Sequence, residues 1–235
     1  MNLRTANLVS FLFGIVVTLS GYFVPSESWS TIVMSIGASI IASSAVVYID
    51  SFYEIKFRAI RDIMEKWKLK AIYKTRGAMN ADCDTAQAEA KKEIDVIGFG
   101  LSSWRDSSTD EIKELLKKGV KIRIMTPNPE SPFVVQRARD EGQADDSIRH
   151  SINKLIEWGT ELREAGGNIE IRTYDWLPMD FYFRIDGALF IGPYLYSKGS
   201  QQTVSFQYEK DGLMYAEYTA YFERVWKAAE KKENV

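Results

Sequence analysis

Two apolar stretches near the amino terminus constrain this chain more than any other feature. Residues 6–24 and 31–49 are each nineteen residues long and contain no Asp, Glu, Lys or Arg. A helix over either stretch would be roughly 28 Å long at 1.5 Å per residue, close to the thickness of the hydrocarbon core of a bilayer. Residues 25–30 separate them, and the nearby Tyr22 and Trp29 suit the membrane interface. The sequence therefore predicts a two-helix transmembrane hairpin over residues 1–50.

A cleaved signal peptide is the alternative interpretation of the first stretch. The hairpin is favoured because a second stretch of equal length follows at once, and because residues 25–29 form a poor small-x-small cleavage site. Residues 51–76 contain eight Lys and Arg residues, whereas residues 25–30 contain none. Because excess positive charge stays on the cytoplasmic side, we expect a multi-pass protein of the inner (cytoplasmic) membrane with both termini in the cytoplasm.

Small residues recur at helical spacing inside both stretches. One row is Ser35, Ser39 and Ser43, and the other is Ser10, Gly14 and Thr18. Close packing between membrane helices is the favoured interpretation, and the lining of an opening between several hairpins is the alternative. Two helices enclose no channel, so an opening requires several copies of the chain. We therefore expect membrane lipid and further copies of the same chain as partners.

The segment 51–76 contains no Pro or Gly and is expected to continue the second span as a basic amphipathic stalk helix. Its apolar positions follow helical spacing: Ile60, Ile63, Met64, Trp67 and Ala71. Such a helix lays its basic face on anionic lipid headgroups, forms a helix–helix seam between protomers, or does both. Residues 77–84 are expected to break this helix, and Asp84 or Thr85 is expected to cap the next one.

The composition of the remaining chain indicates a globular domain and limits its chemistry. Residues 1–50 hold one of the 30 Lys and Arg residues and two of the 32 Asp and Glu residues, which leaves a net charge of −1 for residues 51–235. This balance excludes disorder and offers no electrostatic footprint for nucleic acid, so no nucleic acid polymer is expected as a partner. Cys83 is the single cysteine, which excludes an intramolecular disulfide, and it has no partner at zinc-ligand spacing. We expect no metal and no cofactor.

Residues 77–235 are expected to form a cytoplasmic α/β domain with a mixed sheet flanked by helices. Alternating helix and strand patterns predict strands over residues 94–99, 120–126, 168–174, 181–185, 188–191 and 203–207, and a closing helix over 213–231. Residues 100–108 are expected to form a loop. Ligands on such sheets bind beyond the carboxyl ends of parallel strands. Segments 98–105, 126–128 and 174–176 should therefore surround one opening.

The succession IDVIGFG, LLKKGVKIRIMTPNP, GGNIEIRTY and FYFRIDGALFIGPYLYSKG resembles a single repeat of the phospholipase D superfamily over roughly residues 90–228. That family uses a His-x-Lys-x4-Asp motif, in which the histidine is the nucleophile. Aligning its aspartate with Asp186 places Phe181 at the lysine and Met179 at the histidine. Gly192 keeps the following glycine, but Pro193 and Tyr194 replace the polar pair. His150, the one histidine, lies far from this motif and suits a helix surface. The resemblance implies a catalytically silent domain with no catalytic residue.

Candidate ligand-binding residues follow the expected strands, where hydroxyls, cations and aromatics could meet an anionic nucleotide-like ligand. They are Ser102, Ser103, Trp104, Arg105, Thr126, Asn128, Arg184, Asp186, Tyr194, Tyr196 and Lys198. A structural ion pair between Arg184 and Asp186, and packing of the tyrosines, are the alternatives.

In outline the chain is similar to two-transmembrane effectors that accompany nucleotide-signal synthases in bacterial antiphage operons. That resemblance implies a membrane effector whose inner domain senses a nucleotide-like phosphorylated signal and controls association or opening of the hairpins. A membrane-tethered phosphodiesterase or phospholipase-like enzyme with a substituted site is one alternative. A membrane scaffold that recruits a protein partner is the other.

Overall fold

A computed structural model describes residues 3–177 and 179–231, and it divides the chain into two compact units, Met1–Asp62 and Ile63–Val235. The boundary lies inside a long helix. The first unit contains α1 (Leu3–Gly21) and most of α2 (Glu27–Lys66). The elements of the second unit are β1 (Leu69–Tyr73), α3 (Arg76–Ala88), β2 (Glu93–Ile97), α4 (Ser102–Lys117), β3 (Lys121–Pro127), α5 (Pro132–Asp140), α6 (Ser147–Glu164), β4 (Ile169–Tyr174), β5 (Asp180–Ile185), β6 (Ala188–Pro193), η1 (Ser200–Gln202), β7 (Ser205–Glu209), α7 (Leu213–Ala228) and β8 (Glu230–Lys231).

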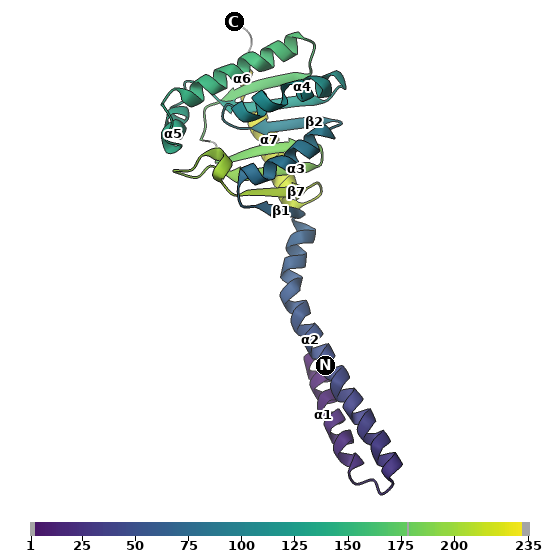
Figure 1. The fold of residues 1–235 in the computed structure, drawn as a ribbon. Helices are drawn as coiled ribbons and strands as arrows, with labels where there is room; N and C mark the ends of the chain where they lie inside the picture. Colours follow the sequence, from purple (N-terminus) through teal and green to yellow (C-terminus); the bar gives the residue numbers. More distant parts are fainter. Residues whose placement is uncertain (1–2, 178, 232–235) are drawn as a thin grey trace. The chain divides into compact units, whose positions relative to one another are not determined.

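In the first unit α1 packs against the first half of α2 through glycines (Figure 1). A Cβ added at Gly37 would lie 2.5 Å from the backbone nitrogen of Thr18 and 2.9 Å from the carbonyl oxygen of Gly14. The side-chain amide of Asn7 donates a hydrogen bond of 3.0 Å across the pair to the carbonyl oxygen of Ser44. The two backbones are therefore in close contact, as small residues allow in membrane helix pairs.

One helix of the described residues is both long and apolar enough to cross a membrane. It is the part of α2 over Glu27–Glu54, which has 28 residues and a mean hydropathy of 2.1. The apolar part of α1, Thr5–Gly21, is a shorter apolar helix. Two equal spans were expected, so the structure supports one candidate span and a shorter apolar helix packed against it.

The second unit is a mixed α/β fold, as the sequence predicts. Its strands follow the order β1-β7-β6-β5-β2-β3-β4-β8 in one sheet. The central strands β2, β3 and β4 are parallel, and the other pairings are antiparallel. Helices α3, α4 and α6 cover one face of the sheet and α7 covers the other (Figure 1). The buried side chains of each layer form a separate core cluster. The carboxyl ends of β2, β3 and β4 therefore open toward the same edge of the sheet.

Strand β2 shows how the sequence builds both layers. Ile94 and Val96 point into the core beneath α4 and α6, whereas Ile97 joins the core beneath α7. Asp95 also lies on the α7 side and is fully buried. The alternation is that of a strand covered on both faces, with a carboxylate in one apolar layer. Such a carboxylate requires charged partners.

Two arginines on the neighbouring strands neutralise Asp95. Arg123 of β3 donates to its two carboxylate oxygens at 2.7 and 2.8 Å, and Nε of Arg184 of β5 donates at 3.0 Å. Arg184 also pairs with Glu93 at 2.7 Å, and Arg123 pairs with Glu223 of α7 at 2.7 Å. The hydrogen bond from Arg184 lowers the pKa of Glu93. This network joins three strands to α7 and leaves no ion pair between Arg184 and Asp186, contrary to the alternative considered above.

The prediction of a stalk helix over residues 51–76 is correct to Lys66 and wrong beyond it. Leu69, Ala71 and Tyr73 alternate inward along β1, which pairs with β7 far away in the sequence. Helical spacing and strand alternation overlap at these few positions, so the apolar stripe alone did not separate them. The expected break at residues 77–84 is likewise wrong, because α3 runs through it from Arg76 with Thr75 as its N-cap.

Candidate functional site

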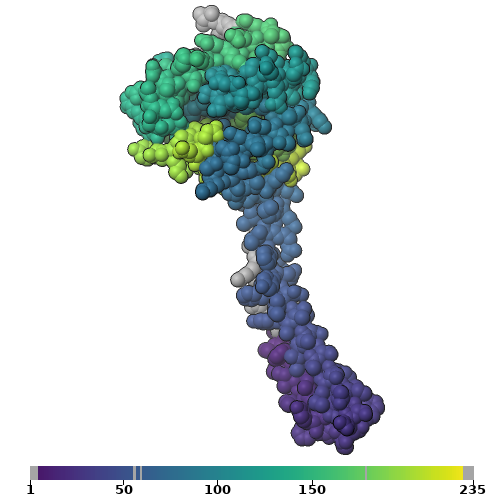
Figure 2. Space-filling view, in the orientation of Figure 1, coloured from purple at the N-terminus to yellow at the C-terminus, as the bar shows by residue number. Residues whose placement is uncertain are grey.

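A cleft of about 380 Å³ lies in the second unit, at the carboxyl end of β2. Its walls come from α3, from the start of α4, from the end of the β6–β7 loop with η1, and from the loop between α5 and α6 with the start of α6. The amide of Asn80 in α3 donates to Gln201 of η1 at 3.3 Å, which joins two of these walls. In Figure 2 the yellow-green segment around η1 lies against the blue surface of α3.

The turn between β2 and α4 brings a helix start directly to this cleft. Gly100 has φ +57°, and a Cβ there would lie 2.5 Å from Cβ of Ser151 in α6. Leu101 follows with φ 46°, a left-handed conformation that is strained for leucine. Leu101 is the N-cap of α4 and provides no side-chain cap. The first backbone N–H groups of α4 therefore have neither an intrahelical partner nor a side-chain cap.

Residues Ser102–Ser108 are helical, although the sequence predicted a loop. No Ser, Thr, Asp or Asn occupies the N-cap position, so the usual signal for a helix start is missing. Ser102 and Ser103 form the first turn of α4 and are exposed at the cleft. The hydroxyls of two serines and the backbone N–H groups of a helix start can all donate hydrogen bonds to an anion.

Arg76, which the sequence interpretation had assigned to the stalk, supplies the positive charge of the cleft. Its guanidinium lies 4.1 Å from the ring centre of Phe181, a stacking contact. Its Nε is buried and has no hydrogen-bond partner. No salt bridge is described for Arg76, whose side chain is half-buried. A guanidinium without a carboxylate beside a helix start is suited to a phosphate or carboxylate ligand.

Two further titratable groups line the cleft and are uncharged at neutral pH. Burial raises the pKa of the Cys83 thiol to about 12, although the nearby Arg76 opposes this shift. Burial also raises the pKa of Tyr194, again against the guanidinium groups of Arg76 and Arg137. Cys83 therefore stays a thiol rather than a nucleophilic thiolate.

Arg137 of α5 holds the loop that forms one wall of the cleft. It donates to the carbonyl oxygens of Leu195 at 3.2 Å and Lys198 at 3.1 Å. Its guanidinium also lies 4.9 Å from the ring centre of Tyr194 and pairs with Glu141 at 2.5 Å. The charge of Glu141 is therefore neutralised by an arginine outside the cleft lining.

Four of the eleven predicted site residues line the cleft: Ser102, Ser103, Trp104 and Tyr194. Trp104 is fixed by a hydrogen bond of 2.5 Å from its indole nitrogen to Gln87 and by an edge contact with Phe183. Tyr194 makes an edge contact with Phe99 at 5.1 Å between ring centres. The sequence identified Ser102, Ser103 and Trp104 because they follow a parallel strand, and Tyr194 because it follows the strand expected over residues 188–191.

Three predicted residues do not line the cleft and have other neighbours. Arg105 pairs with Asp106 at 3.0 Å and is within 3.4 Å of the carbonyl oxygen of Ser151. Thr126 is fully buried, and Asn128 donates to Asp175 at 3.4 Å. None of these three is among the residues that line the cleft described above.

The last four predicted residues do not join the cleft. Arg184 belongs to the buried network around Asp95. Asp186 follows β5 at the amino end of β2, where its carboxylate accepts backbone hydrogen bonds from residues 91, 92 and 93 at 2.8 to 3.0 Å. Tyr196 and Lys198 are exposed on the β6–β7 loop. Because β5 runs antiparallel to β2, the residue after β5 lies at the end of the sheet opposite the opening.

The residues aligned with the histidine and lysine of the motif have no acid–base side chains. Met179 is exposed by 66%, and Phe181 is buried beneath Arg76. His150 is exposed on α6. Within the described part of the chain, no group of three His, Cys, Asp or Glu side chains could hold a metal ion.

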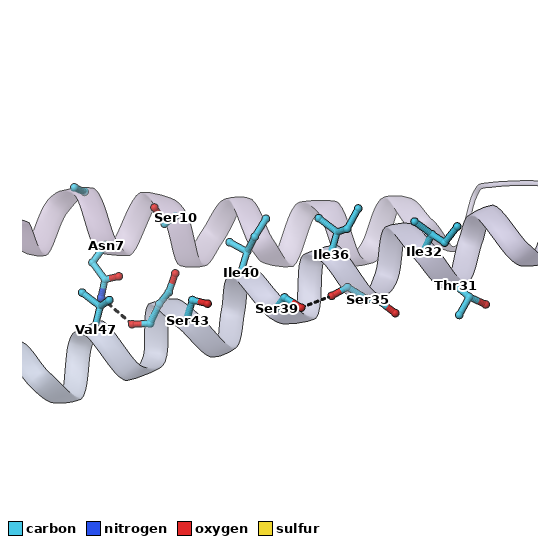
Figure 3. Close-up of a pocket in the computed structure, with 12 residues that line it drawn as sticks. Asn7, Ser10, Thr31, Ile32, Ser35, Ile36, Ser39, Ile40, Ser43 and Val47 are labelled. Atoms are coloured by element: carbon cyan, nitrogen blue, oxygen red, sulfur yellow. Dashed lines mark hydrogen bonds between the residues drawn. The ribbon is translucent and has the colours of Figure 1, made fainter.

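A second concave surface lies along the helix pair of the first unit (Figure 3). It is an open groove of about 810 Å³ lined by one row of α2 and the facing side of α1: Ala6, Asn7, Ser10, Thr31, Ile32, Ser35, Ile36, Ser39, Ile40, Ser43, Ser44 and Val47. Ser35, Ser39 and Ser43 are exposed, and the hydroxyl of Ser39 donates to the carbonyl oxygen of Ser35 at 2.9 Å. The predicted rows thus differ: Gly14 and Thr18 lie in the contact between α1 and α2, whereas the serine row is exposed along the groove.

Comparisons with known proteins give a fold likeness only. No family model matches this chain, and no curated protein matches it in sequence. One solved structure with a similar fold is that of TrmBL2, an archaeal chromatin protein with a novel mode of DNA binding. Its TM-score is 0.46 at 15% identity, and the match covers 83% of this chain and 70% of that chain. Another is NucT from Helicobacter pylori, with a TM-score of 0.45 at 11% identity over 70% of this chain and 99% of that chain.

The sequence-based exclusion of nucleic acid polymers as partners is wrong. It was based only on the balanced charge of residues 51–235, and one of the structures reported above, that of TrmBL2, shows a mode of DNA binding. Net charge averaged over a whole domain does not report how charges are distributed on one surface, so it does not justify the exclusion.

Proposed function

We propose that this chain is a membrane-anchored effector without enzymatic activity, whose α/β unit binds a nucleotide-like phosphorylated signal. Binding would control the association or opening of the apolar helices in the membrane. The observation that carries the proposal is the cleft at the carboxyl end of β2. There the unpaired guanidinium of Arg76, the uncapped start of α4 and the aromatic rings of Phe99 and Tyr194 surround one space.

The absence of a nucleophile in the motif supports binding rather than cleavage. In the proposed phospholipase D likeness, the histidine and lysine positions are occupied by Met179 and Phe181. The cleft thiol of Cys83 is protonated at neutral pH, so it does not replace the missing histidine. A hydroxyl-rich, cation-containing cleft without a nucleophile fits recognition of a phosphoryl group better than its transfer.

The membrane half of the proposal is supported by the helix over Glu27–Glu54 and by the apolar α1 packed on it. In this proposal both helices insert as a pair into the cytoplasmic membrane, with both chain termini in the cytoplasm and several copies associating. Basic residues after the apolar part of α2, such as Arg58 and Arg61, are suited to the anionic inner leaflet.

The binding step is tested with the full chain in detergent micelles and a panel of ligands: nucleoside monophosphates, cyclic mononucleotides, cyclic dinucleotides, ATP and inorganic phosphate. We expect at least one nucleotide to bind in calorimetry and to raise the unfolding temperature. Arg76→Met keeps the aliphatic stem on Phe181 but removes the charge, and should weaken binding at least tenfold. Arg139→Ala, which removes an exposed arginine paired with Asp145, is the matched control and should leave binding unchanged. If no member of the panel binds, the proposal fails.

The membrane step is tested with the same protein in liposomes that contain a self-quenched dye. Ligand that binds the wild-type chain should change the rate of dye release, and the change should be absent in Arg76→Met. Hydrolysed ligand in this reaction would instead favour the phosphodiesterase alternative. A membrane-bound chain that binds no nucleotide but captures a protein would favour the scaffold alternative.

A further inference from the structure

The cleft is small for a nucleotide site. Its volume of about 380 Å³ is near the lower limit of the range of about 300–1,000 Å³ that is typical of ligand pockets. Met79, Leu101 and Phe183 are buried residues of the core and form its floor. Because those side chains are packed in the core, the cleft does not deepen without disrupting the domain.

The cleft also holds little positive charge. Arg76 is the one Lys, Arg or His side chain among the lining residues that the structure describes. The two carboxylates of the lining are Asp84 and Glu141, and Glu141 is neutralised by Arg137. A first phosphoryl group would therefore meet Arg76, whereas a second would meet no cation and would be repelled by Asp84. Within a partly buried cleft such an unpaired charge is costly.

The start of α4 adds partial positive charge at one point only. The uncapped N–H groups of α4 and the hydroxyls of Ser102 and Ser103 belong to one helix turn of the lining. The field of a helix terminus falls off within its first turn, so it supports one anion and does not extend to a second. The anion-binding groups of the cleft are thus sufficient for one phosphoryl group.

The remaining lining is suited to a planar base. Phe99 and Tyr194 offer aromatic surface, and stacking on such rings binds bases of any type. The side-chain amides of Asn80, Gln201 and Gln202 line the same cleft. Each amide has both a donor and an acceptor, which is what the hydrogen-bonding edge of a base requires.

We infer that the cleft binds a ligand with one base and one phosphoryl group, namely a nucleoside monophosphate or a cyclic mononucleotide, and discriminates against dinucleotides and triphosphates. This inference rests on the proposed function and adds the class of ligand. Arg76 and the start of α4 bind the phosphoryl group, the aromatic rings stack on the base, and Asn80 with its neighbouring amides contacts the base edge.

The test compares ligands on the wild-type full chain in detergent, so it does not depend on a variant that folds. The probes are 3′,5′-cyclic mononucleotides and 5′-monophosphates of all four bases, cyclic di-GMP, cyclic di-AMP, ATP and inorganic phosphate. We expect at least one mononucleotide to bind ten times or more tightly than either cyclic dinucleotide and ATP. If a cyclic dinucleotide or ATP binds as tightly as the best mononucleotide, and if Arg76→Met loses that binding, the inference is overturned. The proposed function would still stand. If nothing binds, both fail.

Two variants then test the two halves of the ligand. Asn80→Ala should weaken mononucleotide binding at least threefold and leave the weak binding of inorganic phosphate unchanged. Asp84→Asn should strengthen ATP binding more than mononucleotide binding, because it removes the acidic lining residue that has no arginine partner. Equal loss for nucleotide and phosphate in Asn80→Ala, or no change for ATP in Asp84→Asn, would contradict the assignment.

Discussion

Replacing Asp95 by Asn should destabilise the α/β unit more than any other single change in a charge pair of this chain. The carboxylate is fully buried and accepts hydrogen bonds from both Arg123 and Arg184, whose side chains are 7% and 5% exposed. Asn has nearly the same size, so Asp95→Asn leaves no cavity. It does leave two guanidinium groups in an apolar layer without their shared anion.

The expected cost is about 3–5 kcal/mol, the range for removing one partner of a buried ion pair. A domain of this size loses roughly 2–4 °C of unfolding temperature per kcal/mol, which corresponds to a decrease of roughly 6–20 °C. The matched control is Glu223→Gln, because Glu223 pairs with the same Arg123 but is 43% exposed. An exposed pair contributes about 1 kcal/mol or less.

The assay is thermal unfolding of the full chain in detergent, followed by near-ultraviolet circular dichroism of the buried aromatic residues. The double variant Asp95→Asn/Arg184→Met should recover part of the lost stability, because it removes one of the two cations that have lost their shared anion. If the unfolding temperature of Asp95→Asn lies within 2 °C of that of Glu223→Gln, the buried carboxylate does not hold the network together and the reasoning is refuted.

Three further outcomes follow from the geometry. Cys83 should react with Ellman's reagent at pH 8 at least a hundredfold more slowly than free cysteine, because burial raises its pKa to about 12. Gly37→Leu should separate α1 from α2 and increase hydrogen exchange of the amides of α1, whereas Leu at the exposed Ala38 should not. Arg137→Ala should release the β6–β7 loop and make tryptic cleavage within it several times faster, and the exposed Arg139→Ala should have no such effect.

Each of these outcomes has a result that would contradict it. Rapid labelling of Cys83 in the folded chain would mean that the thiol is accessible and ionised. Unchanged exchange in Gly37→Leu would show that α1 and α2 are not in backbone contact. Equal cleavage in the two arginine variants would show that Arg137 does not fix the loop.

The sequence predicted the sheet well because its strands are local patterns. Runs such as Lys121–Pro127 and Ile169–Tyr174 are short and carry β-branched residues at alternate positions, and they alternate with amphipathic helices, which is typical of a mixed α/β fold. The position of Ser102, Ser103 and Trp104 could also be predicted, because residues after a parallel strand lie at the open edge of the sheet. At these positions the structure expected from the local sequence pattern is also the one that the whole fold adopts.

The sequence could not predict Arg76 as a site residue. Its place in the cleft depends on β1, and β1 is a strand because it pairs with β7, as in the contact between Tyr73 and Gln207 over 134 residues of sequence. A pattern within one segment does not report such a distant partner. Read locally, Trp67 and Ala71 continue the helical stripe of α2, and Arg76 becomes one more basic residue of a stalk.

The same limit explains the error at Arg184 and Asp186. Their spacing of two along one strand suggested a pair or a shared site, but each finds its partner on other strands. Arg184 lies opposite Asp95 in the register of β5 and β2, and Asp186 accepts hydrogen bonds from the backbone before β2. Sheet register decides both contacts, and register is set by the whole fold.

The pairing of the arginines is the strongest physical argument that the cleft has a ligand. Arg105, Arg123, Arg137, Arg149, Arg172 and Arg184 are buried or half-buried, and each pairs with a carboxylate of the same unit. Arg76 is half-buried as well, yet the structure gives it an aromatic ring and no carboxylate. A half-buried cation without an anion destabilises the fold unless something else compensates it. If Arg76→Met stabilises the ligand-free chain but removes binding, the missing anion is the ligand itself. If Arg76→Met destabilises the chain instead, the stacking on Phe181 is sufficient to explain the residue, and the argument for a ligand loses its main support.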